Sequence, residues 1–100
     1  MKNEVLFLEI GKLPKRVSPE NGKKFSLKEL QGYVGGLVEF VPLPSGKLMV
    51  VNEEGKLDGL PVNENATAIF KKEYPKRIYA LNNDELVVGN ALVGAPNFFN

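Results

Sequence analysis

The alternation of apolar and polar residues along the chain predicts several short strands. The run Val5–Ile10 is apolar except for one glutamate, which is typical of a strand. Two further runs, Leu37–Val41 and Lys47–Asn52, flank the turn residues Pro44-Ser45-Gly46 and are expected to pair as an antiparallel hairpin. A last apolar run, Ala91–Val93, predicts another short strand.

Two segments have the pattern of amphipathic helices. Ser26 and Glu29 stand three residues apart in the pattern of a capping box, and apolar residues follow at helical spacing through Val34. Gly35 then favours the end of this helix, because glycine tolerates the left-handed conformation that a helix stop requires. The segment Asn63–Tyr74 predicts a second helix, with its first residue as the cap.

These segments together predict the fold class. We expect an α+β domain with a small twisted antiparallel sheet and one or two short helices on one face of it. The stretch from Pro14 to Gly22 is rich in turn residues and predicts a connecting loop, and 85–88 is a further strand-like run. The chain has 100 residues, which is enough for one hydrophobic core, so 1–100 is expected to form a single domain.

Charge and missing residue types exclude several functions. Thirteen basic residues against twelve acidic ones leave a net charge of +1, so we expect no nucleic-acid and no membrane partner. No apolar run approaches the roughly 20 residues that span a bilayer, and the first residues lack the cleavage site of a signal peptide. Without cysteine and histidine the chain lacks thiolate ligands and the commonest general base. The sequence therefore predicts a cytosolic protein with no cofactor, no metal site and no catalytic residue.

Glu39 is the acidic residue with the clearest candidate role. It shares a strand face with Leu37 and Val41, which leaves three alternatives. The carboxylate is buried and hydrogen-bonded, or it faces a ligand pocket, or it is exposed on an edge strand. Glu53 and Glu54 are adjacent, so on a strand they would point to opposite faces and would not act as a pair.

The segment Lys71–Arg77 carries four positive charges and a tyrosine. Arg77 offers phosphate a planar fork of donors, and Lys76 adds a point charge. The alternative is a solvated helix end, where cations suit the negative pole of the helix dipole. Tyr79 lies beside this cluster in the sequence and offers an aromatic face to a base.

Asn52, Asn63 and Asn90 are neutral side chains that both donate and accept hydrogen bonds. One interpretation gives them a structural role in capping helices and holding turns. The other brings them together around an apolar floor formed by Leu57, Leu60 and Val62, which is the usual makeup of a small-molecule pocket.

Four motifs follow one another in the region 27–93: VGG-x-x-E, N-E-x-G, G-L-x-x-N and G-N-x-L-V. In this order they resemble a family borne by phages and mobile elements that is known only as a domain of unknown function. The resemblance implies an origin rather than an activity. Small phage domains without histidine also resemble proteins that act as sponges for bacterial immune signals, and a sponge needs tight binding and no catalytic group.

Three functions then compete. The favoured one is a phage-encoded, non-enzymatic protein that sequesters a host nucleotide signal, such as a cyclic ADP-ribose or an ADP-ribose conjugate, in the host cytoplasm. The second is a protein-interaction module that inhibits a host protein, and the least favoured is a small hydrolase with Glu39 or Glu53 as its base. The predicted ligand-binding residues are Glu39, Asn52 and Glu53 for ribose, Lys76 and Arg77 for phosphate, Tyr79 for the base, and the amides of Asn63 and Asn90. We expect a homo-oligomer, a dimer or higher, because so small a domain has little surface with which to enclose a nucleotide, and Phe98-Phe99 is a candidate contact.

Overall fold

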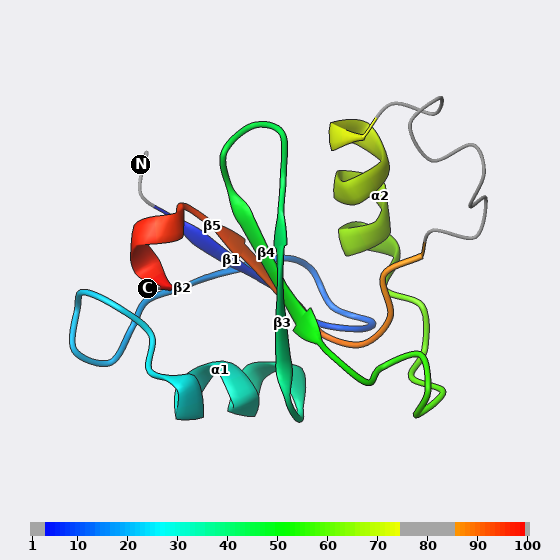
Figure 1. The fold of residues 1–100 in the computed structure, drawn as a ribbon, viewed down its shortest axis with the longest axis horizontal. Helices are drawn as coiled ribbons and strands as arrows, with labels where there is room; N and C mark the ends of the chain where they lie inside the picture. The colour runs from blue at the N-terminus through cyan, green and yellow to red at the C-terminus, as the bar shows by residue number, and fades with distance from the viewer. Residues whose placement is uncertain (1–3, 75–85, 100) are drawn as a thin grey trace.

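The computed structural model describes residues 4–74 and 86–99, whose strands form one five-stranded sheet (Figure 1). The strands are β1 (Val5–Leu8), β2 (Lys15–Val17), β3 (Val38–Pro42), β4 (Leu48–Asn52) and β5 (Ala91–Gly94). They lie in the order β2-β1-β5-β4-β3, and every neighbouring pair is antiparallel. β5, which comes last in the sequence, therefore lies at the centre of the sheet, and β3 lies at one edge.

The helix α1 (Leu27–Val34) begins and ends where the sequence predicts. The hydroxyl of Ser26 accepts a hydrogen bond from the N–H of Glu29 at 3.1 Å, and the Glu29 carboxylate accepts one from the N–H of Ser26 at 2.7 Å. This is the reciprocal capping box, which satisfies two main-chain donors of the first turn. Gly35 ends the helix with φ of 83°, and its N–H donates to the carbonyl of Gln31.

The helix α2 (Glu64–Glu73) is also confirmed, together with its predicted cap. The side-chain oxygen of Asn63 accepts a hydrogen bond from the N–H of Ala66 at 2.9 Å, as an N-cap residue does. Ala66 is fully buried, and Ile69 and Phe70 pack beside it against the sheet. The side of α2 that carries these three residues therefore covers the strands.

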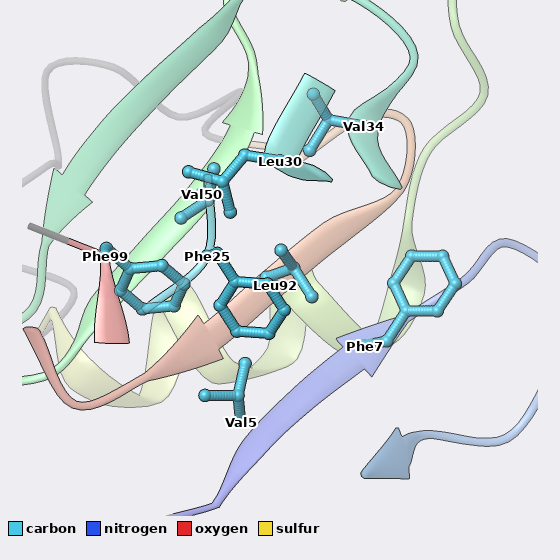
Figure 2. Close-up of a cluster of buried hydrophobic side chains, with 8 residues drawn as sticks. All are labelled: Val5, Phe7, Phe25, Leu30, Val34, Val50, Leu92 and Phe99. Carbon is cyan, nitrogen blue, oxygen red and sulfur yellow. The ribbon is translucent and has the colours of Figure 1, made fainter. Parts of the chain in front are cut away.

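Residues of the strands alternate between two hydrophobic clusters, one on each face of the sheet. Figure 2 shows the cluster on the α1 face, where the side chains of strands, helix and tail converge: Val5, Phe7, Phe25, Leu30, Val34, Val50, Leu92 and Phe99. The cluster on the α2 face consists of Leu8, Leu43, Met49, Ala66, Ala91 and Val93.

The α+β class and the antiparallel sheet are confirmed, but the two helices lie on opposite faces rather than on one (Figure 1). Val50 of β4 faces α1 and its neighbour Met49 faces α2, and neither side chain has exposed surface. Because the central strands are apolar on both sides, each face needs its own helix to exclude water.

The C-terminal tail closes the cluster on the α1 face. The ring of Phe99 stacks on that of Phe25 with 5.8 Å between centroids, and Phe99 is only 6% exposed. The N–H of Phe25 also donates to the carbonyl of Phe98 at 2.8 Å. Phe99 is therefore buried in the core of its own chain, so the predicted contact with a second copy would depend on the half-buried Phe98 and stays a prediction.

Two short elements also depart from the prediction. β2 lies inside the predicted loop and pairs with β1 in the register Leu6↔Arg16. Its three residues are half-exposed or exposed, so no apolar alternation indicates a strand. The strand-like run at 85–88 contributes one isolated bridge, Val62↔Val88, in its described part.

Candidate functional site

A hollow of about 310 Å³ lies on the α2 face of the sheet, beside β3. We call it the β3 hollow, and its lining residues are Glu39, Val41, Met49, Val51, Asn52, Glu53, Lys56, Phe70, Leu86, Val87 and Val88. Its volume falls at the lower end of the range of about 300–1,000 Å³ that small-molecule sites occupy. The hairpin β3–β4, the helix α2 and the segment that leads into β5 thus meet around a space of the right size for a small organic molecule.

Glu39 and Glu53 lie on the same face of the β3–β4 hairpin. Glu39 is directly opposite Val51, and the N–H of Glu53 donates to the carbonyl of Leu37 at 2.8 Å, one residue beyond β4. Alternate residues of a strand share a face, so both glutamates project toward α2. They are diagonal neighbours across the ladder, which lie about 7–8 Å apart, with their Cβ atoms somewhat closer. A molecule in the hollow can therefore meet two carboxylates.

The structure excludes one of the three alternatives for the Glu39 side chain. β3 is an edge strand and the Glu39 side chain is exposed, so the buried alternative is wrong. The same side chain lines the β3 hollow, so its role as a ligand-binding carboxylate stays a prediction.

The β3 hollow has an apolar floor and a charged rim. Met49 is fully buried at the floor, with Val41 and Val51 half-buried beside it. The predicted floor within Leu57–Val62 does not line the hollow, and Leu57 is 87% exposed. Lys56 also lines the hollow and is exposed, a residue that no motif in the sequence indicated.

The side-chain amide of Asn52 is directed away from the β3 hollow. Its Nδ2 donates to the carbonyl of Val34 at 3.2 Å, at the end of α1, and its Oδ1 accepts from the N–H of Glu54 at 2.8 Å. These contacts lie on the α1 face, so Asn52 holds the helix end against the turn that follows β4. These two contacts agree with the structural interpretation of this residue, which is also among the residues that line the hollow.

Asn63 and Asn90 also have structural contacts, and they lie apart from the β3 hollow. The Nδ2 of Asn63 donates to the carbonyls of Leu8 and Gly89, both at 2.8 Å, and the Oδ1 of Asn90 accepts from the N–H of Ile10 at 2.9 Å. Asn63 is 2% exposed and borders a second, wider depression of about 520 Å³ beside the loop Glu9–Leu13. The three asparagines therefore do not converge on one site, and a direct role in ligand binding stays an untested prediction for them.

The remaining predicted residues, Lys76, Arg77 and Tyr79, lie outside the residues that the structure describes. Of the eight predicted ligand-binding residues, the β3 hollow brings together Glu39, Asn52 and Glu53. No motif in the sequence indicated Phe70, which lines the hollow from α2 and also packs against the cluster on that face.

The chemistry available in the described part of the β3 hollow is hydrogen bonding and apolar contact. Exposed carboxylates accept hydrogen bonds from hydroxyl or amino groups, and Lys56 donates them. Within residues 4–74 and 86–99, no group of three or more metal-ligating side chains is found, and no helix there is long and apolar enough to cross a bilayer.

Comparison with known proteins gives one match. Residues 1–97 match the family described as "Domain of unknown function (DUF3846)", a wider region than the 27–93 over which the motifs were found. No curated protein and no solved structure matches the chain.

Proposed function

The chain belongs to the DUF3846 family, a domain family of unknown function, and we propose its function from the candidate site. We propose that it is a non-enzymatic protein that binds a nucleoside-containing signal in the β3 hollow and sequesters it. The observation that carries this proposal is the pair Glu39 and Glu53 above an apolar floor. The origin we propose is a phage or mobile element, and the place of action is the cytosol of the bacterial host.

A ribose and a base match the two parts of the β3 hollow. The 2′- and 3′-hydroxyls of a ribose are donors, and the carboxylates of Glu39 and Glu53 are acceptors on the same face. A base is flat and largely apolar on its faces, and the valine side chains of the floor and the ring of Phe70 offer it apolar contact. Binding through such groups needs no proton transfer, which agrees with a chain that has no histidine or cysteine.

The phosphates of a nucleotide need cations as well. Lys56 is the basic residue that lines the described part of the β3 hollow. We propose that Arg77 and Lys76 of the basic segment add to it, because a guanidinium binds a phosphate through two parallel hydrogen bonds. A cyclic ADP-ribose or an ADP-ribose conjugate carries the ribose, the base and the phosphates that these groups would bind.

Calorimetric titration with a panel of nucleosides, cyclic nucleotides and ADP-ribose derivatives tests the proposal. We expect one or more members of the panel to bind, and Glu39→Gln and Glu53→Gln each to weaken that binding about tenfold, the loss of one hydrogen bond to a charged group. Glu54→Gln is the matched control, because Glu54 is adjacent to Glu53 but does not line the hollow. Recovery of the ligand with its mass unchanged distinguishes sequestration from hydrolysis.

A protein-interaction module is the second candidate. The observation that favours it is Leu57, a large apolar side chain that is 87% exposed on the turn after β4. A folded protein that binds no member of the nucleotide panel would favour this function over the first.

A further inference from the structure

The hydrogen bonds of the β3–β4 hairpin determine which main-chain groups of β3 face outward. At one end the N–H of Glu53 donates to the carbonyl of Leu37 at 2.8 Å, and at the other the N–H of Leu43 donates to the carbonyl of Lys47 at 2.9 Å. Main-chain groups of successive residues point to opposite edges of a strand. The odd-numbered residues from 37 to 43 therefore bond to β4, and the even-numbered ones face away from the sheet.

The outer edge of β3 is consequently open over Val38 and Phe40. In the part of the chain that the structure describes, the outward N–H and C=O groups of these two residues have no hydrogen-bond partner. The carbonyl of Pro42 also faces outward and accepts a hydrogen bond from the Tyr74 hydroxyl. Pro42 has no N–H to donate. An open edge of this kind is a template for another strand.

The two edges of the sheet differ in character. At the β3 edge, Phe40 is 42% exposed and Leu37 is 53% exposed. At the opposite edge, β2 carries Lys15 and Arg16, and Arg16 forms an ion pair of 3.1 Å with Glu4. Charged side chains on an edge strand oppose pairing with a further strand, whereas exposed apolar ones favour it. The β3 edge is therefore the one suited to contact.

We propose that β3 pairs with β3 of a second copy of this chain, antiparallel about a two-fold axis that passes between the two Phe40 residues. In this register each Phe40 N–H donates to the Phe40 carbonyl of the other copy, and each Val38 N–H donates to the Pro42 carbonyl of the other copy. That carbonyl then accepts two hydrogen bonds, one on each lone pair, because the Tyr74 hydroxyl already donates to it. The edge is thus self-complementary, with four main-chain hydrogen bonds. Pro42 has no N–H, so the pairing leaves no donor without a partner at that position.

Electrostatics selects this register over the neighbouring one. A shift by two residues also gives four hydrogen bonds, but it places Glu39 directly opposite Glu39 of the second copy. Like charges that face each other across a ladder destabilise the pair. In the proposed register Glu39 faces Val41 of the second copy, and the two Phe40 rings are opposite each other on the α1 face, where aromatic pairs stabilise a sheet.

The pairing also completes the β3 hollow, and this consequence rests on the proposed function. Glu39 and Val41 line the hollow from β3 itself, at the open edge. The second copy would place its Val41 beside Glu39 on the same face and so extend the apolar floor. Two hollows then lie side by side across the axis, and the partner copy contributes a residue to each site.

The expected interface is small. A stable specific interface buries about 1,200–2,000 Å² in total, and two five-residue strands bury less than this. We therefore expect an equilibrium between monomer and dimer that shifts with concentration, rather than a permanent dimer.

Cysteine cross-linking tests both the contact and its register. The chain has no cysteine, so a single introduced cysteine can form a disulfide only between two copies. In a hydrogen-bonded antiparallel pair the Cα atoms are about 5.5 Å apart, within the range that a disulfide spans. We expect Phe40→Cys to cross-link faster than Glu39→Cys and faster than Leu57→Cys, whose position is 87% exposed and serves as the collision control. Equal rates at the three positions would overturn the proposal, and fastest cross-linking of Glu39→Cys would overturn the register.

Sedimentation of the unmodified chain is the second measurement. We expect the mass to rise from 11.0 kDa toward twice that value as concentration increases, and Phe40→Lys to abolish the rise while Leu13→Lys preserves it. Circular dichroism on each variant verifies that it is folded. If the mass stays at 11.0 kDa at all concentrations while nucleotide still binds, the proposed interface is wrong and the proposed function is unaffected. If the chain dimerises but binds no nucleotide, the proposed function is wrong and the interface is unaffected.

Discussion

The side-chain amide of Asn63 donates to the main-chain carbonyl of Leu8 at 2.8 Å, across 55 positions of sequence. The same nitrogen donates to the carbonyl of Gly89 at 2.8 Å, and the oxygen of the same amide caps α2 through the N–H of Ala66. One buried side chain thereby joins the end of β1, the start of α2 and the segment before β5. The sequence predicted only the cap, because the other two partners are distant along the chain.

We expect Asn63→Ala to reduce the free energy of unfolding by about 2–4 kcal/mol, the loss of a helix cap plus buried carbonyls left without donors. Asn63→Ser keeps a capping oxygen and loses the two donors, so its effect should be smaller. The matched control is Asn65→Ala, an exposed asparagine two residues away, which should change stability little. Urea unfolding of the three variants checks the order, and equal stability of Asn63→Ala and Asn65→Ala would contradict it.

Local features of the fold could be predicted from the sequence, whereas the placement of its parts could not. The capping box of Ser26, the stop at Gly35 and the cap at Asn63 depend on contacts within a few residues, and all three are confirmed. The division of the helices between two faces depends on strands that are apolar on both sides. In a short apolar run, alternation does not show whether one face or both are covered.

Gly94 provides a test of how closely β1 and β5 pack. A Cβ atom at this position would lie 2.7 Å from Cγ2 of Val5, a residue that is 1% exposed. We expect Gly94→Ala to destabilise the fold by about 1–3 kcal/mol, because extra volume in a filled core forces its neighbours to shift. Gly32→Ala in the exposed part of α1 meets nothing within 4 Å and should stabilise by about 0.5–1 kcal/mol through helix propensity. Thermal unfolding of both variants measures the difference, and shifts of the same sign would refute this account of Gly94.

The capping box makes α1 sensitive to acid. Hydrogen bonds from the main-chain N–H groups of Ser26 and Glu20, together with the Ser26 hydroxyl, lower the pKa of Glu29 below its ordinary value of 4.5. A carboxylate with a lowered pKa stabilises the fold at pH values above 4.5, and this contribution is lost as the pH falls through the pKa of the folded state. We expect Glu29→Gln to be less stable than the unmodified chain at neutral pH and to lose less stability on acidification.

Denaturant midpoints at neutral pH and below pH 4.5 measure this effect. Glu20→Gln is the control. It removes a nearby carboxylate but keeps the main-chain N–H of residue 20, which donates a hydrogen bond to the Glu29 carboxylate. If Glu29→Gln follows the same pH dependence as Glu20→Gln, the capping box is not the origin of the acid sensitivity.

Part of the lining of the β3 hollow could be predicted from the sequence. Glu39 was singled out by its position in an apolar strand, and Glu53 joins it because pairing with Leu37 continues one residue beyond β4. Lys56 could not be predicted, since its place at the rim depends on how the turn after β4 folds back. The asparagines were conspicuous in the sequence, yet Asn52 is turned toward α1 by its bond to Val34.

The last prediction distinguishes residues that contact the phosphates of the ligand from residues that contact its nucleoside part. If Lys56 contacts a phosphate, Lys56→Met should weaken nucleotide binding by up to about fivefold, the scale of an exposed charge contact, and should leave nucleoside binding nearly unchanged. Arg77→Ala should have a larger effect in the same direction, roughly tenfold or more, because a guanidinium binds phosphate through two hydrogen bonds. Lys28→Met, an exposed substitution on α1, is the control for net charge. Calorimetry with each nucleotide and its nucleoside gives the ratio, and a loss that is equal for both would show that these cations do not contact the phosphates.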